Sequence, residues 1–193
     1  MMETRIMRLI LASSSPRRQK LLGQMGYSFE IVAPDVAETI GRDESPGDHV
    51  LRVSREKAES VAADFPDDCV LGADTVVVLD NLIFGKPRSR EEASGMLKTL
   101  SGRTHIVYTG LSLIHLSGGT SLSRYDSTRV TFNNLNEIDI EQYIKSGEPM
   151  DKAGAYGIQD MGSFLVDRYD GELDTVIGFP RKLFEQMYQE VAG

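Results

Sequence analysis

The stretch that decides the fold is Cys69-Val70-Leu71-Gly72-Ala73-Asp74-Thr75-Val76-Val77-Val78-Leu79. Nearly every residue in it is apolar, as in a strand that is covered on both faces, which favours a sheet enclosed by helices. Strand-like and helix-like segments alternate before it, and two long β-type runs follow it. We therefore predict an α/β fold with a mixed, twisted sheet flanked by helices, with parallel strands early in the chain and antiparallel strands later.

Capping and turn residues set the bounds of the other elements. We predict helices from Ser15-Pro16 to Gly26, from Ser45-Pro46 to about Ala63, from Ser89 to Gly102, from Asn136 to Gly147 and from about Pro180 onward. We predict further strands at 9–12, 27–32, 82–84, 104–116, 122–132 and 164–169, with hairpin turns at 80–81 and 117–120. No repeat or linker divides the chain, so we predict one domain over 1–193, with two lobes around a central cleft and an N-terminal extension at 1–7.

Composition excludes several classes of function. The 193 residues include 21 Lys+Arg and 29 Asp+Glu, for a formal net charge of −8 at pH 7. That balance argues against binding of polymeric nucleic acid, which depends on neutralising phosphates, but a local basic cluster can still hold a triphosphate. No apolar stretch approaches the ~20 residues that span a bilayer. The single cysteine, Cys69, lies in an apolar context, so we expect a buried structural thiol in a cytoplasmic protein that contacts no membrane.

Asp74 is the most informative polar residue, because it interrupts the apolar strand. A buried carboxylate is costly unless it is paired or bound to a metal. Backbone N–H donors or a salt bridge within the chain would satisfy it. A strand is also a rigid mount for a general base or a metal ligand, so the residues alone leave these alternatives open.

The segment Ser13-Ser14-Ser15-Pro16-Arg17-Arg18 has the outline of a phosphate-binding site. Hydroxyls, backbone N–H groups and a helix N-terminus stand beside two arginines. The alternative is an ordinary capped helix with solvated arginines. Lys57 and Lys86, taken alone, are more typical of surface lysines, and Glu38 of an acidic loop.

A second segment, Asp151-Lys152-Ala153-Gly154-Ala155-Tyr156-Gly157-Ile158-Gln159, combines small residues with a terminal amide. Small residues let a backbone approach a ligand closely, and an amide both donates to and accepts from a pyrimidine edge. The segment is equally compatible with a tight loop. P-loop, dinucleotide-binding and Gly-x-Ser-x-Gly motifs are missing. His49, His105 and His115 are isolated in the sequence, so we expect structural roles for them.

Together these blocks resemble the Maf family of nucleoside triphosphate pyrophosphatases. The blocks that carry the resemblance are Ser-x-Ser-Pro-Arg-Arg at 13–18, Arg-Glu-Lys-Ala at 55–58, Gly-Ala-Asp-Thr-Val at 72–76, Lys-Pro at 86–87, Leu-Ser-Gly at 100–102 and Asp-Lys-Ala-Gly-Ala-Tyr-Gly-Ile-Gln at 151–159. They follow the family's order from about Leu9 to Pro180. The last block resembles the branch that acts on dTTP and UTP, whereas the branch that acts on 7-methyl-GTP lacks the run ending in Gly-Ile-Gln.

The resemblance implies a fold similar to that of the inosine triphosphate pyrophosphatases. It implies hydrolysis of a nucleoside triphosphate to the monophosphate and pyrophosphate with a divalent cation, Mg²⁺ or Mn²⁺. The family is associated with removal of non-standard nucleotides and with arrest of cell division at the septum, and dimers are common in it. Two alternatives to a dTTP/UTP pyrophosphatase stay open: a non-catalytic, nucleotide-sensing regulator of septum formation, and the same reaction on 7-methyl-GTP.

The site residues that the resemblance implies fall into three groups. Asp74 takes the place of the catalytic proton acceptor, and Glu38 and Asp74 are the carboxylates available to a metal. The residues expected to bind phosphate or metal are Ser13, Arg18, Glu38, Lys57 and Lys86. The residues linked to the choice of base are Arg17, Thr75 and Gln159. Two departures from the family pattern are mild: a glycine precedes Lys86 where an acidic residue also occurs, and residues 1–7 lengthen the start.

Overall fold

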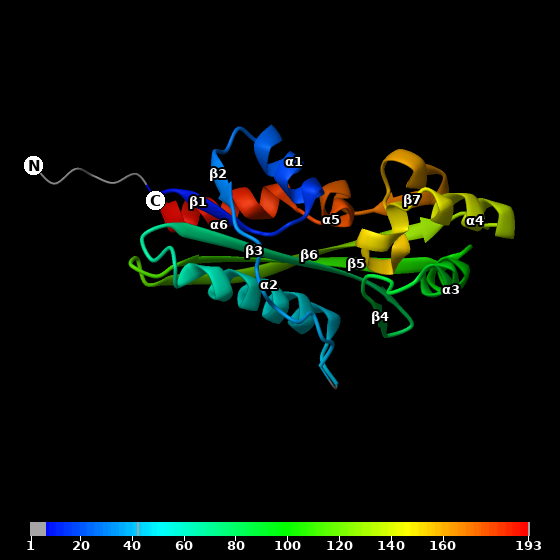
Figure 1. Cartoon of the computed structure of the whole chain (residues 1–193), viewed down its shortest axis with the longest axis horizontal. Coiled ribbons are helices and arrows are strands. Elements are labelled where there is room, and N and C mark those ends of the chain that lie inside the picture. Colours follow the sequence, from blue (N-terminus) through cyan, green and yellow to red (C-terminus); the bar gives the residue numbers. More distant parts are fainter. Residues whose placement is uncertain (1–6, 42, 193) are drawn as a thin grey trace, which may run out of the picture. The chain divides into compact units, whose positions relative to one another are not determined.

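The computed structural model in Figure 1 describes residues 7–41 and 43–192, so the predicted extension at 1–7 lies outside the described residues apart from Met7. The described strands are β1 (Leu9–Ala12), β2 (Phe29–Ile31), β3 (Cys69–Leu79), β4 (Leu82–Phe84), β5 (Thr104–His115), β6 (Thr120–Phe132) and β7 (Val166–Asp170). The α-helices are α1 (Pro16–Gln24), α2 (Pro46–Ala62), α3 (Arg90–Leu100), α4 (Glu137–Lys145), α5 (Leu173–Ile177) and α6 (Arg181–Ala192). Three 3₁₀ turns are η1 (Glu148–Asp151), η2 (Ala153–Ala155) and η3 (Asp160–Leu165).

These strands form one mixed sheet in the order β2-β1-β3-β5-β6-β7, with β4 paired to β3. β1 lies parallel to both β2 and β3, so that Leu9 pairs with Phe29 on one side and with Cys69 on the other. β4 pairs antiparallel with β3, and β7 antiparallel with β6. The predicted α/β fold with a mixed sheet and flanking helices is therefore confirmed, as is the change from parallel to antiparallel strands along the chain.

Most predicted elements appear within a few residues of their expected bounds, and β3 matches its prediction of 69–79. The expected strand at 164–169 starts only at Val166, because the residues before it form η3. α5 and the turns η1 and η2 were not expected from the sequence. Elements this short are below the length at which a helical period of apolar residues becomes visible, and 3₁₀ turns carry no 3.6-residue period.

The described residues divide into two compact units. The first comprises the chain up to Asp74 together with Gly110–Tyr125 and the chain from Arg181, and the second comprises Thr75–Thr109 and Asp126–Pro180. Three of the four boundaries fall inside β3, β5 and β6, and the fourth falls between α5 and α6. The single domain and the central cleft inferred above stay predictions.

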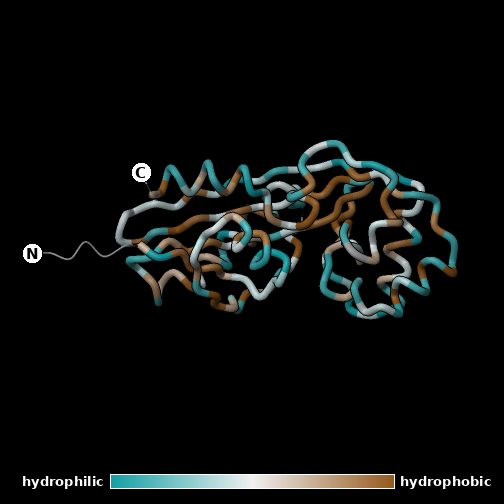
Figure 2. Tube along the Cα trace, turned by 90° about the horizontal axis from the view of Figure 1, so that it is seen from above, coloured by the Kyte–Doolittle hydropathy of each residue, from teal (hydrophilic) through white to brown (hydrophobic). Residues whose placement is uncertain are grey.

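Each unit has an apolar core of its own, and Figure 2 shows hydrophobic residues running along the strands. In the first unit, Ile10 of β1 and Val70 of β3 are fully buried and pack with Ala58 of α2. Gly72 makes that packing close, because a Cβ there would lie 2.0 Å from the backbone oxygen of Ser54 on α2. The sequence run that predicted β3 therefore also explains why α2 lies against it.

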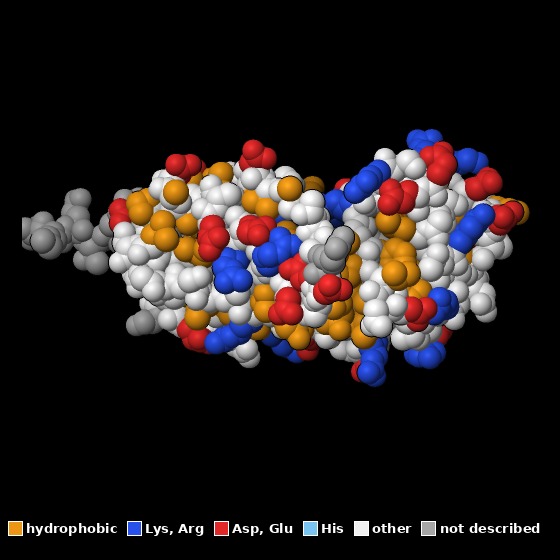
Figure 3. Space-filling model, turned by 90° about the horizontal axis from the view of Figure 1, so that it is seen from below, with side chains coloured by type: hydrophobic (Ala, Val, Ile, Leu, Met, Phe, Trp, Pro, Cys, Tyr) orange, Lys and Arg blue, Asp and Glu red, His pale blue; other side chains and the backbone are white. Residues whose placement is uncertain are grey.

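In the second unit, α3 and α4 pack on the sheet through a larger core. Its fully buried members include Leu97 and Leu100 of α3 and Tyr143 of α4, together with Val130 of β6. Among the described residues no helix is both long and apolar enough to cross a membrane. Figure 3 shows acidic and basic side chains intermingled on the face it presents, rather than one basic surface.

Candidate functional site

Two carboxylates hold one buried ammonium group in the first unit. The Nζ atom of Lys57 on α2 lies 2.8 Å from Asp74 Oδ1 and 2.7 Å from Glu38 Oε1. Lys57 and Asp74 are 5% and 4% exposed. The interpretation of Lys57 as a surface lysine is therefore wrong, because the close packing of α2 on β3 brings its ammonium to the buried carboxylate.

The same contact resolves part of the question that Asp74 raised. A salt bridge within the chain was one of the alternatives for this carboxylate, and the bond to Lys57 confirms it. Removing one partner from a buried ion pair leaves an uncompensated charge, so each group depends on the other for its burial. The roles of Asp74 as proton acceptor and as metal ligand stay predictions.

His49 is a neighbour of Asp74 that sequence reasoning missed. It is 2% exposed, its Nε2 lies 3.7 Å from Asp74 Oδ2, and its Nδ1 lies 3.0 Å from Glu44 Oε2. His49 lies eight residues before Lys57, a little over two helical turns, so both side chains can approach Asp74 of β3 from a similar side of α2. That spacing was the available clue, but it gains meaning only once Lys57 is known to be buried.

Arg52 of α2 holds the loop that carries Glu38. Its guanidinium donates to Glu44 Oε1 at 2.7 Å and to the backbone oxygen of Thr39 at 2.8 Å. The hydrogen bond from Arg52 is the main cause that lowers the pKa of Glu44 to about 2, with a further contribution from His49. Because Thr39 follows Glu38 directly, this anchor explains how a carboxylate from an irregular loop reaches Lys57.

The serine- and arginine-rich segment lies where β1 passes into α1. Ser13 is 4% exposed, and its Oγ accepts from the backbone N–H of Ser15 at 3.2 Å and from Arg18 Nη1 at 3.3 Å. Ser15 is the N-cap residue and Pro16 opens α1, both as predicted, although the Ser15 side chain makes no capping bond. The hydroxyl that orders this turn is therefore that of Ser13.

Electrostatics link Arg18 to the carboxylate pair. Burial lowers the pKa of the Arg18 guanidinium, whereas the nearby charges of Asp74 and Glu38 raise it and that of Arg17 lowers it further. Arg18 therefore lies in the field of the same two carboxylates that hold Lys57. The structure brings together these predicted residues in the first unit: Ser13, Arg17, Arg18, Glu38, Lys57 and Asp74.

The other three predicted residues belong to the second unit. Thr75 follows Asp74 on β3, and its hydroxyl lies 3.0 Å from that of Thr109. Lys86 is exposed just after β4, and Gln159 is exposed at the start of η3. The backbone N–H of Gly154 donates to the oxygen of Gly85 at 3.0 Å, so the segments that carry Lys86 and Gln159 are joined by a main-chain hydrogen bond.

The segment 151–159 has a tightly determined backbone. Gly154 and Ala155 both have positive φ, +65° and +60°, and a Cβ on Gly154 would lie 2.8 Å from Val77. A left-handed alanine is strained and persists only where its surroundings hold it. The backbone N–H of Gly157 donates to the Tyr143 hydroxyl at 3.0 Å, which provides one such restraint. The tight loop is thus confirmed, and its role in the choice of base stays a prediction.

His105 provides the other restraint on this segment. Its Nε2 lies 2.7 Å from the Tyr156 hydroxyl, and its ring packs edge-to-face against Phe132 and Tyr156. Burial lowers the pKa of His105 to about 4, so the ring is neutral at physiological pH. The expected structural role of this histidine is therefore confirmed. Cys69 is likewise buried, and burial raises the pKa of its thiol to about 12, as expected for a structural cysteine.

The carboxylate pair fits a hard divalent cation by its donor chemistry. Glu38 and Asp74 each place an oxygen within 2.8 Å of one atom, Lys57 Nζ, so their oxygens converge on a common point. No group of three or more His, Cys, Asp or Glu side chains able to hold a metal occurs in the part of the chain that the structure describes. Mg²⁺ characteristically takes one or two carboxylates and completes its shell with water and substrate phosphates, which matches a pair rather than a cage.

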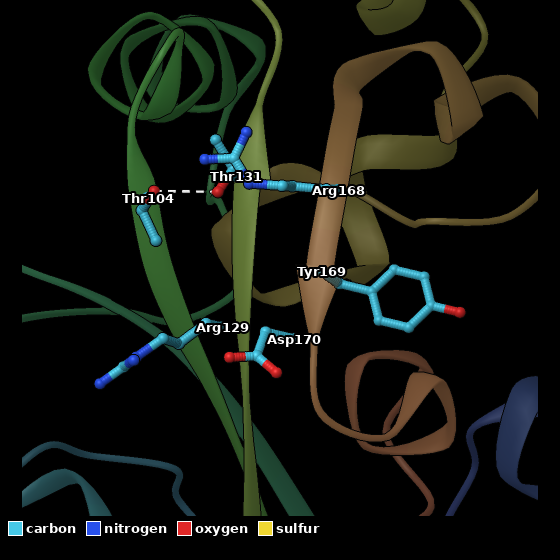
Figure 4. A pocket seen from close by; sticks show the side chains of 6 residues that line it. All are labelled: Thr104, Arg129, Thr131, Arg168, Tyr169 and Asp170. Carbon is cyan, nitrogen blue, oxygen red and sulfur yellow. Dashed lines mark hydrogen bonds between the residues drawn. The ribbon is translucent and has the colours of Figure 1, made fainter.

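The pocket drawn in Figure 4 is a different place. It is lined by Thr104, Arg129, Thr131, Arg168, Tyr169 and Asp170, from β5, β6 and β7. The hydroxyls of Thr104 and Thr131 face each other across the two strands at 2.9 Å, and Tyr169 points away from them. None of the residues predicted for the site lines this pocket, and nearly all of its side chains are exposed, so it is a surface hollow apart from the candidate site.

The protein has an α/β fold with a mixed sheet, and its candidate site holds a buried lysine, two carboxylates and an arginine beside a helix N-terminus. These features are typical of proteins that bind small anionic substrates. A model of the family described as Maf-like protein matches residues 8–191, and the chain belongs to this family.

Several similar relatives carry one name. A dTTP/UTP pyrophosphatase of Syntrophus aciditrophicus is 49% identical over 90% of this chain and 84% of its own length. A dTTP/UTP pyrophosphatase of Vibrio parahaemolyticus is 48% identical over 94% of this chain and 96% of its own length. One of Bacillus anthracis is 46% identical over 90% of each chain. Among solved structures, the Ham1 protein of Staphylococcus aureus is similar with a TM-score of 0.47 and 13% identity, over 66% of this chain and 72% of that chain.

Proposed function

We propose that this protein is a nucleoside triphosphate pyrophosphatase that hydrolyses dTTP and UTP to the monophosphate and pyrophosphate. Relatives of that name match it at 46% to 49% identity over at least 90% of its length. The observation that carries the proposal is the ammonium of Lys57 held between Glu38 and Asp74, in the electrostatic reach of Arg18. Cationic side chains bind phosphates and carboxylates hold cations or accept protons, so this cluster contains both halves of the required chemistry.

The basic residues bind the triphosphate. Arg18 offers planar donors suited to phosphate oxygens, and Lys57 offers a point charge that its carboxylate partners already orient. Lys86, exposed on its loop, adds a third positive charge. Negative charge develops on the pyrophosphate as it leaves, and fixed cations stabilise that charge in the transition state more than in the ground state.

Asp74 acts as the general base. A water molecule attacks the α-phosphorus, a bond forms between its oxygen and phosphorus, and the bond to the bridging oxygen breaks so that pyrophosphate leaves with the electron pair. The proton of the water passes to Asp74. Its Oδ1 is bound to Lys57, whereas Oδ2 has His49 Nε2 at 3.7 Å, beyond hydrogen-bond distance, which makes Oδ2 the better placed acceptor.

A divalent cation, Mg²⁺ or Mn²⁺, is part of the proposal, with Glu38 and Asp74 as the residues that would hold it. When bound, such a cation neutralises charge on phosphate oxygens and lowers the pKa of a bound water. The choice of base falls to Arg17, Thr75 and Gln159. We also propose a cytoplasmic homodimer that removes non-standard nucleotides and is linked to arrest of cell division, which rests on the family resemblance.

A panel of triphosphates tests the proposal. Release of pyrophosphate from dTTP, UTP, CTP, GTP and 7-methyl-GTP is measured with Mg²⁺ or Mn²⁺, and the nucleoside monophosphate is identified as the second product. We expect the highest kcat/KM for dTTP and UTP. Preference for 7-methyl-GTP would overturn the substrate assignment, and absence of release from every triphosphate, with binding retained, would favour a nucleotide-sensing regulator instead.

A further inference from the structure

One buried hydroxyl lies against both ends of the turn that carries Gln159. Tyr143 of α4 is 0% exposed, and its Oη accepts a hydrogen bond from the backbone N–H of Gly157 at 3.0 Å. A Cβ on Gly162 would lie 2.9 Å from the same oxygen, so the backbone of Gly162 lies against it as well. Gln159 lies between these two glycines, and its side chain is exposed. The turn 157–162 therefore starts and ends beside one fixed atom.

The two ends of this turn also contact each other. A Cβ on Gly162 would lie only 2.0 Å from the backbone oxygen of Gly157, so position 162 accepts no larger residue unless the backbone shifts. The backbone N–H of Gly162 donates to the oxygen of Gln159 at 3.2 Å. Just beyond the turn, the ring of Phe164 packs edge-to-face on that of Tyr143, with the ring centroids 6.1 Å apart. The turn is therefore a closed unit that rests on the Tyr143 side chain.

The chain that leads into the turn is held independently. Tyr156 is 5% exposed, and its hydroxyl lies 2.7 Å from His105 Nε2. Ala155, before it, has a φ of +60°, which its surroundings must maintain. On the side chain of Lys152, Cε would lie 2.8 Å from a Cβ on Gly157. Gly157 is therefore confined between Lys152 and the hydroxyl of α4, which leaves its peptide little room to rotate.

We propose that Tyr143 is a positioning residue that holds the Gln159 amide at the distance required by the edge of a pyrimidine base. This inference rests on the proposed function, in which Gln159 contributes to the choice of base. The Gln159 side chain makes no capping bond to η3, so its position depends on that of its backbone. The hydrogen-bonding edge of a purine lies one ring farther from the sugar than that of a pyrimidine. A turn fixed in one place therefore favours one of the two classes of base.

The decisive measurement is the ratio of kcat/KM for UTP to that for GTP. Tyr143→Phe keeps the ring and removes the acceptor of the Gly157 N–H, so the turn gains freedom to move. We expect the UTP:GTP ratio to fall about tenfold, the effect of one hydrogen bond that distinguishes two substrates. The UTP:CTP ratio should change by less than about twofold, because these two bases have the same reach.

The double variant Tyr143→Phe/Gln159→Ala shows whether Tyr143 acts through the amide. If it does, Tyr143→Phe should change the UTP:GTP ratio by less than about twofold once Gln159 is alanine, because the group that it positions is already missing. A further tenfold fall in the double variant would mean that the two residues act separately, and it would overturn the inference.

Thr128→Val is the matched control. Thr128 of β6 is 1% exposed, and its hydroxyl donates to the backbone oxygen of Glu172 at 2.9 Å in the same unit. Both substitutions remove one buried hydroxyl that bonds the main chain, so we expect a similar loss of Tm. The UTP:GTP ratio should be unchanged in Thr128→Val. An equal fall of the ratio in the two variants would show a general effect of destabilising this unit and would overturn the inference.

Hydrogen exchange of the Gly157 amide supplies a measurement on the wild-type protein, which does not depend on the folding of any variant. The probes are the α,β-imido analogues of UTP and GTP, in which the bond that is hydrolysed is replaced. At saturation the UTP analogue should slow this exchange about tenfold and the GTP analogue less, because a base that bonds the turn stabilises its contact with Tyr143.

An unchanged exchange rate of the Gly157 amide with bound UTP analogue, or an unchanged UTP:GTP ratio in folded Tyr143→Phe, would overturn the inference. Equal losses of kcat/KM for UTP and GTP in that variant would do the same. These results leave the proposed function standing, whereas a wild-type protein that releases pyrophosphate from no triphosphate overturns the proposed function itself.

Discussion

The two units differ in the polar groups that they bury. The first unit holds the buried charged residues of the described chain, Lys57, Asp68 and Asp74: one ammonium lies between two carboxylates, and Arg18 lies in their field. In the second unit the buried polar residues that the structure describes are neutral: threonine hydroxyls bond one another, and the His105 ring is kept uncharged by its burial.

This difference corresponds to two kinds of recognition. Charge–charge attraction is strong in a buried place but depends little on direction, which suits a triphosphate and a cation. A bond between neutral groups is weaker but distinguishes a donor from an acceptor, which suits the edge of a base. We therefore expect changes in the charged cluster of Lys57, Glu38 and Asp74 to affect the rate for every nucleotide, and changes at neutral groups of the second unit to affect the ranking of nucleotides.

The largest expected effect comes from Asp74→Asn. The amide is nearly the same size, but it neither accepts a proton nor supplies a negative charge, so kcat for dTTP and UTP should fall by about a thousandfold or more. Pyrophosphate release under saturating substrate measures it. Turnover within tenfold of the wild-type value would remove Asp74 from the mechanism.

Asp68→Asn is the matched control for that substitution. Asp68 is also a buried acid of the first unit, 1% exposed, and it accepts from Arg8 Nη2 and Nε. Its amide variant should lose stability, because the buried carboxylate loses its ion pair with the half-exposed Arg8, and keep kcat once folded. If both variants lost the same activity, burial of a carboxylate rather than its chemistry would explain the effect of Asp74→Asn.

Lys57→Met should be next in size, and it tests the charged cluster as a unit. Without the ammonium, the buried Asp74 carboxylate loses its hydrogen-bonded cation, which costs about 3–5 kcal/mol of the free energy of unfolding. A cation held by the same two carboxylates would replace the lost charge. We therefore expect added Mg²⁺ to raise the Tm of Lys57→Met by more than that of the wild type.

The double variant Lys57→Met/Asp74→Asn should lose this extra response to Mg²⁺. Lys98→Met serves as the surface control: its ion pair with Glu137 is exposed at both ends, so its removal should cost less than about 1 kcal/mol. Equal Mg²⁺ responses in the wild type and Lys57→Met would argue against a cation site at Glu38 and Asp74.

The neutral second unit makes a prediction about acid. Burial lowers the pKa of His105 from 6.5 to about 4, and the neighbours that keep it neutral are Tyr156 and Phe132. As the pH falls below 6.5, His105 binds a proton in the unfolded chain, whereas in the folded chain it binds one only near pH 4. The contribution of His105 is therefore fully present above pH 6.5 and lost toward pH 4, a difference of about 3 kcal/mol.

Urea unfolding at several pH values measures this dependence. His105→Phe removes the titrating group and keeps an aromatic ring beside Phe132, so its free energy of unfolding should fall less steeply between pH 6.5 and pH 4.5 than that of the wild type. Parallel pH curves for the two proteins would show that the buried ring does not titrate in this range.

The sequence predicts the helices and strands better than it predicts the contacts between them. The apolar run of β3 and the capping residues of the helices fixed most element bounds, because these depend on local patterns. The buried position of Lys57 could not be predicted, since it depends on how α2 lies on β3. Gly72 permits that close packing, but the sequence does not say that the residue facing it is Ser54.

The hydrogen bonds that link Thr75, Thr109 and the backbone of Thr175 in the second unit could not be predicted for a similar reason. Thr75 and Thr109 are 34 residues apart, and Thr109 and Thr175 are 66 apart, on three different elements. Threonine is common in strands, so none of them stands out by type or spacing. Candidate residues such as Asp74 could be named because a charge in an apolar strand is costly, whereas a satisfied neutral hydroxyl leaves no comparable trace.

The smallest expected effect, and the sharpest test of the division between rate and ranking, is Gln159→Ala. Gln159 is exposed at the start of η3, so its loss should cost little stability. Its amide offers a donor and an acceptor to a base edge, and removing both should reduce the preference for UTP over GTP and CTP by about tenfold while kcat for UTP changes less. Gln142→Ala, an exposed glutamine of α4, controls for loss of an amide. If Gln159→Ala instead slowed all nucleotides equally, with the ranking intact, this segment would serve the phosphates, and the assignment of neutral groups to base choice would rest on Thr75 alone.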